Sequence, residues 1–192
     1  TPLLVNIDRA SDIEALVRLT QAHKLKAIIV GGSEAWMVAD ELATAGIAVV
    51  LAPTANLPRS FDSINARRGA PKILEAAGVK IAFTETRAEA HNARNITQSA
   101  GNAVRDGLSW DAALRAITLT PAEIYGVADT VGSIEVGKAA DVVIWPADPL
   151  ELTTYPDRVL INGEDIPMVS RQTLLRDRYL QTDSDKPPVY RD

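Results

Sequence analysis

Apolar residues in the first half of the chain form a repeated pattern of short runs and longer amphipathic segments. The runs lie at residues 3–7, 27–30, 48–51 and 79–83, and a segment with helical periodicity follows each of them. Because the runs are rich in Val, Ile and Leu and do not alternate with polar residues, they are typical of strands covered on both faces of a parallel sheet. The pattern therefore predicts an α/β fold.

Capping residues predict where the helices begin. Ser11 and Glu14 have the spacing of a capping box, which places the first helix at residues 12–23. Ser33 is expected to cap a second helix whose buried side includes Met37. Further helices are predicted after Pro71, from about 94 to 106, after Ser109 and after Thr120.

The pattern of residues changes after Gly126: turn residues and short apolar runs replace the helical segments and predict a second, smaller unit. Its strands are expected at residues 141–145, 158–161 and 166–169. The Asn162-Gly163 pair between two of these runs is a strong hairpin signal. We therefore divide the chain into residues 1–128, residues 129–181 and a tail at 182–192.

Composition narrows the classes of function. The chain has 192 residues, of which 46% are apolar, and a chain of this length buries roughly 70% of its unfolded surface, so one compact core is expected. A formal net charge of -5 without clustered Lys and Arg argues against nucleic acid and against an anionic membrane as partners. No apolar run approaches the ~20 residues that span a bilayer. A small molecule is the expected partner.

Two counts limit metal chemistry. The chain has no cysteine, which removes a thiol nucleophile and a thiolate zinc site. Its two histidines are His23 and His91. His23 lies at a predicted helix end, where a cation complements the helix dipole, so its role is structural.

Polar side chains that follow the apolar runs are candidates for a site, because parallel α/β folds bind ligands at the carboxyl ends of their strands. Glu85 is the strongest candidate catalytic residue, as a general base or a metal ligand; alternatively it pairs with Arg87 or Arg94, or caps a helix. His91 is a candidate acid or base, or else a solvated loop histidine. The candidate substrate-binding residues are Asn6, Glu34, Trp36, Asn92, Arg94 and Asn95.

The segment Gly31-Gly32-Ser33 lies between a strand and a helix, a position where exposed amides can bind an anion. It lacks the P-loop lysine and the spacing of a dinucleotide motif. A tight turn is therefore the favoured interpretation.

One block of the sequence resembles a known family. It comprises Gly107-Leu108-Ser109, Thr120-Pro121-Ala122, Gly132-Ser133-Ile134-Glu135-Val136-Gly137-Lys138 and Ala140-Asp141-Val142-Val143-Ile144-Trp145. A helix pair followed by this entry into a β domain resembles the amidohydrolase superfamily, in its imidazolonepropionase-like branch. The resemblance extends over about residues 3–179. It implies hydrolysis of C–N bonds in amides and cyclic amides by water activated at zinc or another divalent metal.

The resemblance also implies an incomplete architecture. Family members combine a (β/α)8 barrel with a small β-sandwich built from both chain ends, and four βα units are half of a barrel that needs ~250 residues. The expected fold is the second half of a TIM-type (β/α)8 barrel followed by part of a small β-sandwich domain. The start Thr1-Pro2-Leu3, without Met, favours a cut or processed end. Because a half barrel has open strand edges, we expect a homo-oligomer in which another copy covers them.

Within the retained half, the metal ligands of the family fall on other residue types. The resemblance puts the fifth-strand histidine at Asn6, the sixth-strand histidine at Gly31 and the eighth-strand aspartate at Thr86, with Glu85 beside it. An amide is a poor zinc ligand and glycine has no side chain. We therefore expect no metal ligand in this chain and an incomplete or inactive form of the enzyme. The alternatives are a non-catalytic relative that binds a small polar or carboxylated ligand at the same barrel mouth, and a doubly wound binding domain with a self-sufficient sheet.

Overall fold

A four-stranded parallel sheet forms the centre of the fold. The computed structural model describes residues 2–55, 57–85 and 90–180, apart from the side chains of residues 90 and 91. The strands lie in the order β1-β2-β3-β4 and each pairs in parallel with its neighbour, so the predicted α/β class is confirmed. Their bounds are β1 (Leu3–Ile7), β2 (Ala27–Gly31), β3 (Ala48–Leu51) and β4 (Ile81–Phe83).

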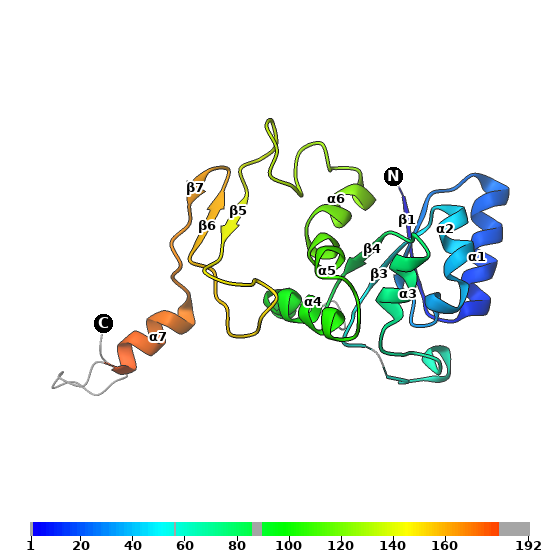
Figure 1. The fold of residues 1–192 in the computed structure, drawn as a ribbon, viewed down its shortest axis with the longest axis horizontal. Helices are drawn as coiled ribbons and strands as arrows, with labels where there is room; N and C mark the ends of the chain where they lie inside the picture. Colours follow the sequence, from blue (N-terminus) through cyan, green and yellow to red (C-terminus); the bar gives the residue numbers. More distant parts are fainter. Residues whose placement is uncertain (1, 56, 86–89, 181–192) are drawn as a thin grey trace.

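Helices follow the strands and cover the sheet. In Figure 1, α1 and α2 lie together at one side of the sheet, and α4, α5 and α6 lie on its other side, in the middle of the molecule. No helix within the described ranges is long and apolar enough to cross a membrane. The helical segments are α1 (Ala10–His23), η1 (Ala35–Val38), α2 (Ala39–Ala45), η2 (Phe61–Ser63), α3 (Ala70–Ala76), η4 (Ala90–Asn95), α4 (Ile96–Arg105), α5 (Trp110–Ile117) and α6 (Leu119–Tyr125).

Both faces of the parallel sheet carry buried apolar side chains. The larger cluster includes the fully buried side chains of Ile13, Ile29, Leu42, Val49 and Leu74. A smaller cluster on the alternate strand positions contains Ile28, Val50 and Ala82, packed against Val30 and Ile124. Burial on both faces explains why the strand sequences do not alternate with polar residues. It leaves the carboxyl ends of the strands as the place for a site.

The start of α1 is set by a residue distant in the sequence. We predicted a capping box at Ser11, but the helix begins at Ala10, with Arg9 as its N-cap residue and no side-chain cap from that position. The Ala10 N–H instead donates to Glu34 Oε2 at 3.0 Å. A long-range carboxylate therefore satisfies a helix-end donor that a local side chain usually satisfies.

The second helix also differs from the prediction. Ser33 does not cap it, because the Ser33 hydroxyl donates to Asp8 Oδ1 at 2.7 Å, and a 3-10 turn precedes α2. Met37 is 48% exposed rather than buried. Ser109, in contrast, caps α5 as predicted, since its Oγ accepts the Ala112 N–H at 3.2 Å.

The second unit contains a small antiparallel sheet at one end of the molecule (Figure 1). Asn162 and Gly163 have φ values of 51° and 81°, the positive values that a two-residue hairpin turn requires, so the predicted hairpin is confirmed. The strand predicted at 166–169 is wrong, because pairing resumes directly after the turn. The elements are β5 (Val142–Ile144), β6 (Arg158–Ile161), β7 (Glu164–Asp165) and α7 (Arg171–Leu180), of which α7 was not predicted.

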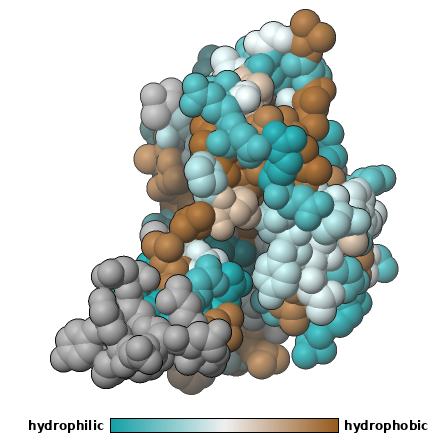
Figure 2. Space-filling model, turned by 90° about the vertical axis from the view of Figure 1, so that its left-hand side faces the viewer, coloured by the Kyte–Doolittle hydropathy of each residue, from teal (hydrophilic) through white to brown (hydrophobic). Residues whose placement is uncertain are grey.

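Apolar side chains of this unit reach the surface, and Figure 2 shows some of them between polar neighbours. The exposed ones include Val143, Ile144, Ile161, Met168 and Leu174. Their exposure means that the described part of the chain covers this sheet incompletely. Membership of a larger β-sandwich domain and the bounds 1–128 and 129–181 stay predictions, and the tail at 182–192 lies outside the described residues.

The segment around Asp148 and Leu150, between β5 and β6, contacts the helices beside the parallel sheet. Trp110 Nε1 on α5 donates to both carboxylate oxygens of Asp148, at 3.1 and 3.0 Å, and the Leu150 N–H donates to Asp148 Oδ1 at 2.9 Å. The Leu150 side chain belongs to the main core, and its carbonyl lies against Gly101 of α4. The segment is thereby anchored to α4 and α5.

Candidate functional site

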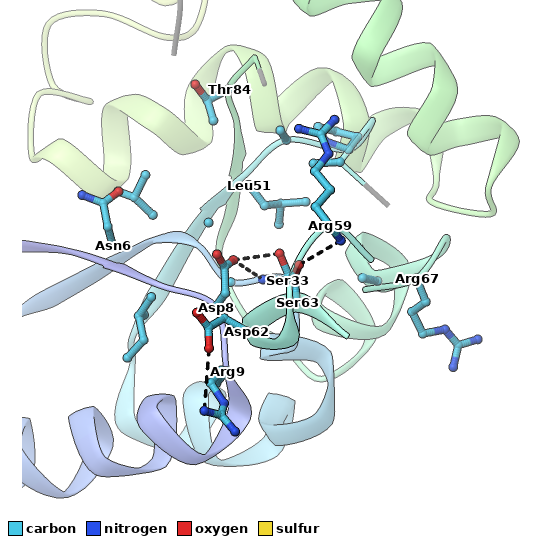
Figure 3. A pocket seen from close by; sticks show the side chains of 18 of the residues that line it. Asn6, Asp8, Arg9, Ser33, Leu51, Arg59, Asp62, Ser63, Arg67 and Thr84 are labelled. Carbon is cyan, nitrogen blue, oxygen red and sulfur yellow. Dashed lines mark hydrogen bonds and ion pairs between the residues drawn. The ribbon is translucent and has the colours of Figure 1, made fainter. Parts of the chain in front are cut away.

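A cavity of about 720 Å³ lies at the carboxyl ends of all four parallel strands. Each strand or the residues after it contribute to the lining, including Asn6, Asp8, Ser33, Leu51 and Thr84 (Figure 3). This is the edge at which parallel α/β folds bind ligands. The candidate residues Asn6 and Glu85 lie at this edge.

Asp8 joins the end of β1 to the end of β2. Its Oδ1 accepts the Ser33 N–H at 3.0 Å and the Ser33 hydroxyl at 2.7 Å. Gly31 has a φ of +99°, and a Cβ at this position would lie 3.0 Å from Asp8 Oδ1, so the turn requires glycine. The Gly32 N–H donates to the Ile7 carbonyl at 2.8 Å. These amides already have acceptors, which supports the tight-turn interpretation of the segment.

Glu34 is buried, with 6% of its surface exposed, and its carboxylate links two segments. Besides the Ala10 N–H, it accepts the Asn65 N–H and the Asn65 Nδ2–H on Oε1, at 3.1 and 3.0 Å. Burial alone would raise the pKa of Glu34, but these hydrogen bonds and the charge of Arg9 lower the pKa below its usual value. Glu34 is not part of the described lining, and its substrate-binding role stays a prediction.

Trp36 holds the same loop as Glu34. Its Nε1 donates to the Asn65 carbonyl at 3.0 Å, and the Arg67 guanidinium lies 4.8 Å from the centre of its ring. Trp36 is likewise missing from the described lining. Its effect on the cavity therefore passes through the loop at residues 52–69, which does line the cavity.

Glu85 lies in the cavity lining and has a buried partner. Ser99 of α4, with 3% of its surface exposed, donates its hydroxyl to Glu85 Oε1 at 2.6 Å. Arg94 is not among the described partners of Glu85, and Arg87 lies outside the described residues. The structure thus brings Glu85 and Asn6, two of the candidates, to one cavity.

The other candidates fall on η4. The His91 side chain lies outside the described residues, as does Thr86, where the resemblance places the aspartate of the family. Asn92, Arg94 and Asn95 are described but do not belong to the described lining of the cavity. Their roles in catalysis or binding stay predictions.

The donor set of the cavity does not suit the divalent metal that the resemblance implies. Asn6 offers an amide and Gly31 offers no side chain at the positions where the resemblance places two histidine ligands. The carboxylates of Asp8 and Glu85 each accept a hydrogen bond from a serine hydroxyl. Across the described ranges, no group of three or more His, Cys, Asp or Glu side chains could hold a metal ion.

The cavity also contains residues that do not directly follow a strand. Arg59, Asp62 and Ser63 come from the loop at residues 52–69, and Asp62 lies 3.6 Å from Arg9. The rule that ligands bind at strand ends applies to the first residues after each strand, whereas this loop returns to the cavity later in the chain. Its length was the available signal, because connections between strands and helices usually have about 2–6 residues.

The chain is similar in sequence to proteins of known families. The model of a family described as "Amidohydrolase family" matches residues 13–166. The chain is also 42% identical to an imidazolonepropionase of Erwinia tasmaniensis over 65 residues, which are 31% of this chain and 16% of that protein.

Solved structures with a similar fold are longer than this chain. An amidohydrolase of Thermotoga maritima MSB8 superposes with a TM-score of 0.78 at 29% identity, covering 86% of this chain and 43% of that one. An adenosine deaminase of Xanthomonas campestris with bound zinc superposes with a TM-score of 0.58 at 20% identity, covering 92% and 49%. The chain therefore spans less than half the length of either structure.

Proposed function

The chain belongs to the amidohydrolase family, and from this premise we propose that it is the second half of a TIM-type barrel with part of the small β-sandwich domain. Family membership supports a hydrolase-like function, and the reaction we propose for the complete barrel is hydrolysis of C–N bonds in amides or cyclic amides. One observation carries the proposal: four parallel strands open at their carboxyl ends into a single cavity. The coverage of the Thermotoga maritima amidohydrolase, 43% of its length, supports the assignment to half a barrel.

Within such a barrel, this half supplies surface that binds the substrate. The Asn6 amide, the Thr84 hydroxyl and the Glu85 carboxylate lie in the lining and can hydrogen-bond to a small polar molecule. A divalent metal, where a family member binds one, supplies activated water. Because the side chains of this half do not fit such a metal, we assign no step of the reaction to it here and propose that the chain alone is an inactive form.

Purified chain is therefore expected to show no turnover on a panel of amides, lactams and cyclic ureas, with and without added zinc. The physical reason is that the described strand ends offer no imidazole and no group of three side chains that could hold a metal ion. Release of amine or ammonia would be measured, with a complete family member purified in the same way as the positive control. Turnover above the blank that grows with the concentration of the chain would refute the inactive form.

A second candidate function is binding of a small polar ligand without catalysis. Two features favour this function. Asn6 and Gly31 stand where the resemblance places two histidine ligands, and neither can hold a metal that activates water. The polar side chains that remain, with Asp8 and Glu85 held by serine hydroxyls, can still bind a polar ligand. Binding without turnover in the same panel separates this function from hydrolysis.

We also propose that a second copy covers the free edge of β1 when this chain is in solution alone. In the described sheet β1 pairs with β2 on one side, and Leu3 and Leu4 are each 49% exposed. An exposed edge of this kind is a template for another strand. Sedimentation velocity is expected to give a mass above that of the monomer, rising with concentration. A monomer across the whole concentration range would refute the proposal.

A further inference from the structure

The described residues of the loop at 52–69, which are all but residue 56, form one wall of the cavity, and contacts of Asn65 and Ser63 hold them in place. Asn65 is fastened to the body of the fold through its backbone and side chain. Inside the loop, Ser63 Oγ accepts the Arg59 N–H at 3.3 Å. The backbone that carries Arg59 therefore has a defined position at the cavity.

Three arginines line the cavity, and two of them have partners. Arg9 pairs with Asp62 at 3.6 Å, and Arg67 lies over the Trp36 ring. The Arg59 guanidinium has no ion pair or hydrogen bond to any other described residue; the described contact of Arg59 is made by its backbone. Arg59 is exposed, and within the described chain it is the lining arginine whose guanidinium contacts no other charged or aromatic side chain.

Three of the four acidic groups of the lining have other partners among the described residues. The Asp8 and Glu85 carboxylates accept serine hydroxyls, and Asp62 pairs with Arg9. In Figure 3, the Arg59 side chain extends beside Leu51 on the side of the cavity toward Thr84, whereas Asp8 and Asp62 lie together on the other side. The Arg59 guanidinium is therefore open to an acceptor on a bound molecule, which would replace water at this exposed side chain.

We propose that Arg59 binds the carboxylate of a small ligand in this cavity and thereby selects carboxylated substrates. The planar guanidinium matches a carboxylate through two parallel hydrogen bonds, and Leu51 beside it offers apolar surface to the rest of the ligand. Four carboxylates and three guanidinium groups line the cavity, so a singly charged acid is tolerated better than a doubly charged phosphate. The proposal rests on the proposed function because both place the site in this cavity. It does not require that the chain turns over a substrate.

The test measures binding by isothermal titration calorimetry on the full chain. The probes are N-acetyl-L-leucine and N-acetyl-L-leucinamide, which differ in the carboxylate, and inorganic phosphate. Parent protein is expected to bind the acid about tenfold more tightly than the amide, the order of one charge-assisted hydrogen-bond pair. Arg59→Gln is expected to remove this preference, and Arg59→Lys to keep part of it, because lysine retains the charge but not the fork.

The matched control is Arg68→Gln, in the same loop but outside the described lining. It should leave the tenfold preference intact. Equal loss in both variants, or an unchanged preference in Arg59→Gln, would overturn the role of Arg59, and tighter binding of phosphate would overturn the ligand class. Equal binding of acid and amide by the parent would remove the Arg59 proposal while the cavity remains a binding site. Absence of binding by any probe would overturn the cavity as the site in both proposals.

Discussion

Replacing Glu34 by glutamine is expected to lower the free energy of unfolding by about 2–3 kcal/mol. The Glu34 carboxylate is buried and accepts three hydrogen bonds, one from the start of α1 and two from Asn65. A glutamine side chain has one carbonyl oxygen, so its NH₂ group would face a donor that now has an acceptor. Urea unfolding of Glu34→Gln measures the loss, and Glu41→Gln, an exposed carboxylate on α2, is the control that should leave stability unchanged.

The same substitution has a predicted pH dependence. The pKa of Glu34 is lowered in the folded chain, so its ionised form adds stability above its unfolded pKa of about 4.5. That contribution is lost as the pH falls through the lower, folded pKa. The difference in stability between parent and Glu34→Gln should therefore be constant from about pH 8 to pH 5.5 and shrink below about pH 4. A difference that stays constant down to pH 2 would show that the ionised form is not what stabilises the loop.

Replacing Gly101 by alanine is expected to destabilise the chain by about 1–3 kcal/mol, although Gly101 lies inside a helix. Alanine in place of glycine usually stabilises a helix by roughly 0.5–1 kcal/mol, so the expected change has the opposite sign. The reason is that a Cβ at Gly101 would overlap the Leu150 carbonyl oxygen. Since that atom belongs to the backbone, α4 or the segment that carries Leu150 must move.

Two readouts separate this effect from a general loss of stability. Urea unfolding gives the change in free energy, and hydrogen exchange at the Leu150 amide, which donates to Asp148, reports local detachment of the segment. Gln98→Ala on the same helix is the control, because Gln98 is exposed. A Gly101→Ala variant as stable as the parent, with unchanged exchange at Leu150, would contradict the close packing seen here.

The sequence predicted those elements whose residue types follow from burial on both faces, from a turn conformation or from a helix cap within a few residues. The strands at 27–30 and 48–51 could be predicted because burial on both faces leaves uninterrupted apolar runs. The hairpin at Asn162-Gly163 could be predicted because few other residues adopt two consecutive positive φ values. Ser109 could be assigned as a cap because its Oγ accepts the N–H of Ala112, only three residues further along the chain.

Errors arose where a distant residue decides the local structure. Ser11 has the spacing of a cap, but the donor at Ala10 is satisfied by Glu34, on the connection after the next strand. Ser33 has the position of a cap, but Asp8 accepts its hydroxyl. These partners meet only once the parallel sheet has formed, so no window of local sequence contains the information.

The candidate site also contains residues that local sequence could predict and residues that depend on distant contacts. Asn6 and Glu85 could be predicted from the rule that strand ends carry ligands, and both lie in the cavity lining. Arg59 could not be predicted by that rule, because its place depends on how the loop at residues 52–69 folds back over the strand ends. The contacts of Asn65 that fix this loop are tertiary contacts to Glu34 and Trp36.

The most direct measurement of the central claim is the zinc content of the purified full chain after equilibration with zinc and removal of the free metal. The claim is that this half of an amidohydrolase barrel supplies binding surface at its strand ends and no metal centre. The account predicts far less than one zinc per chain, because Asn6 and Gly31 stand where the resemblance places two histidine ligands. One zinc held tightly by each chain, together with turnover of an amide, would contradict it.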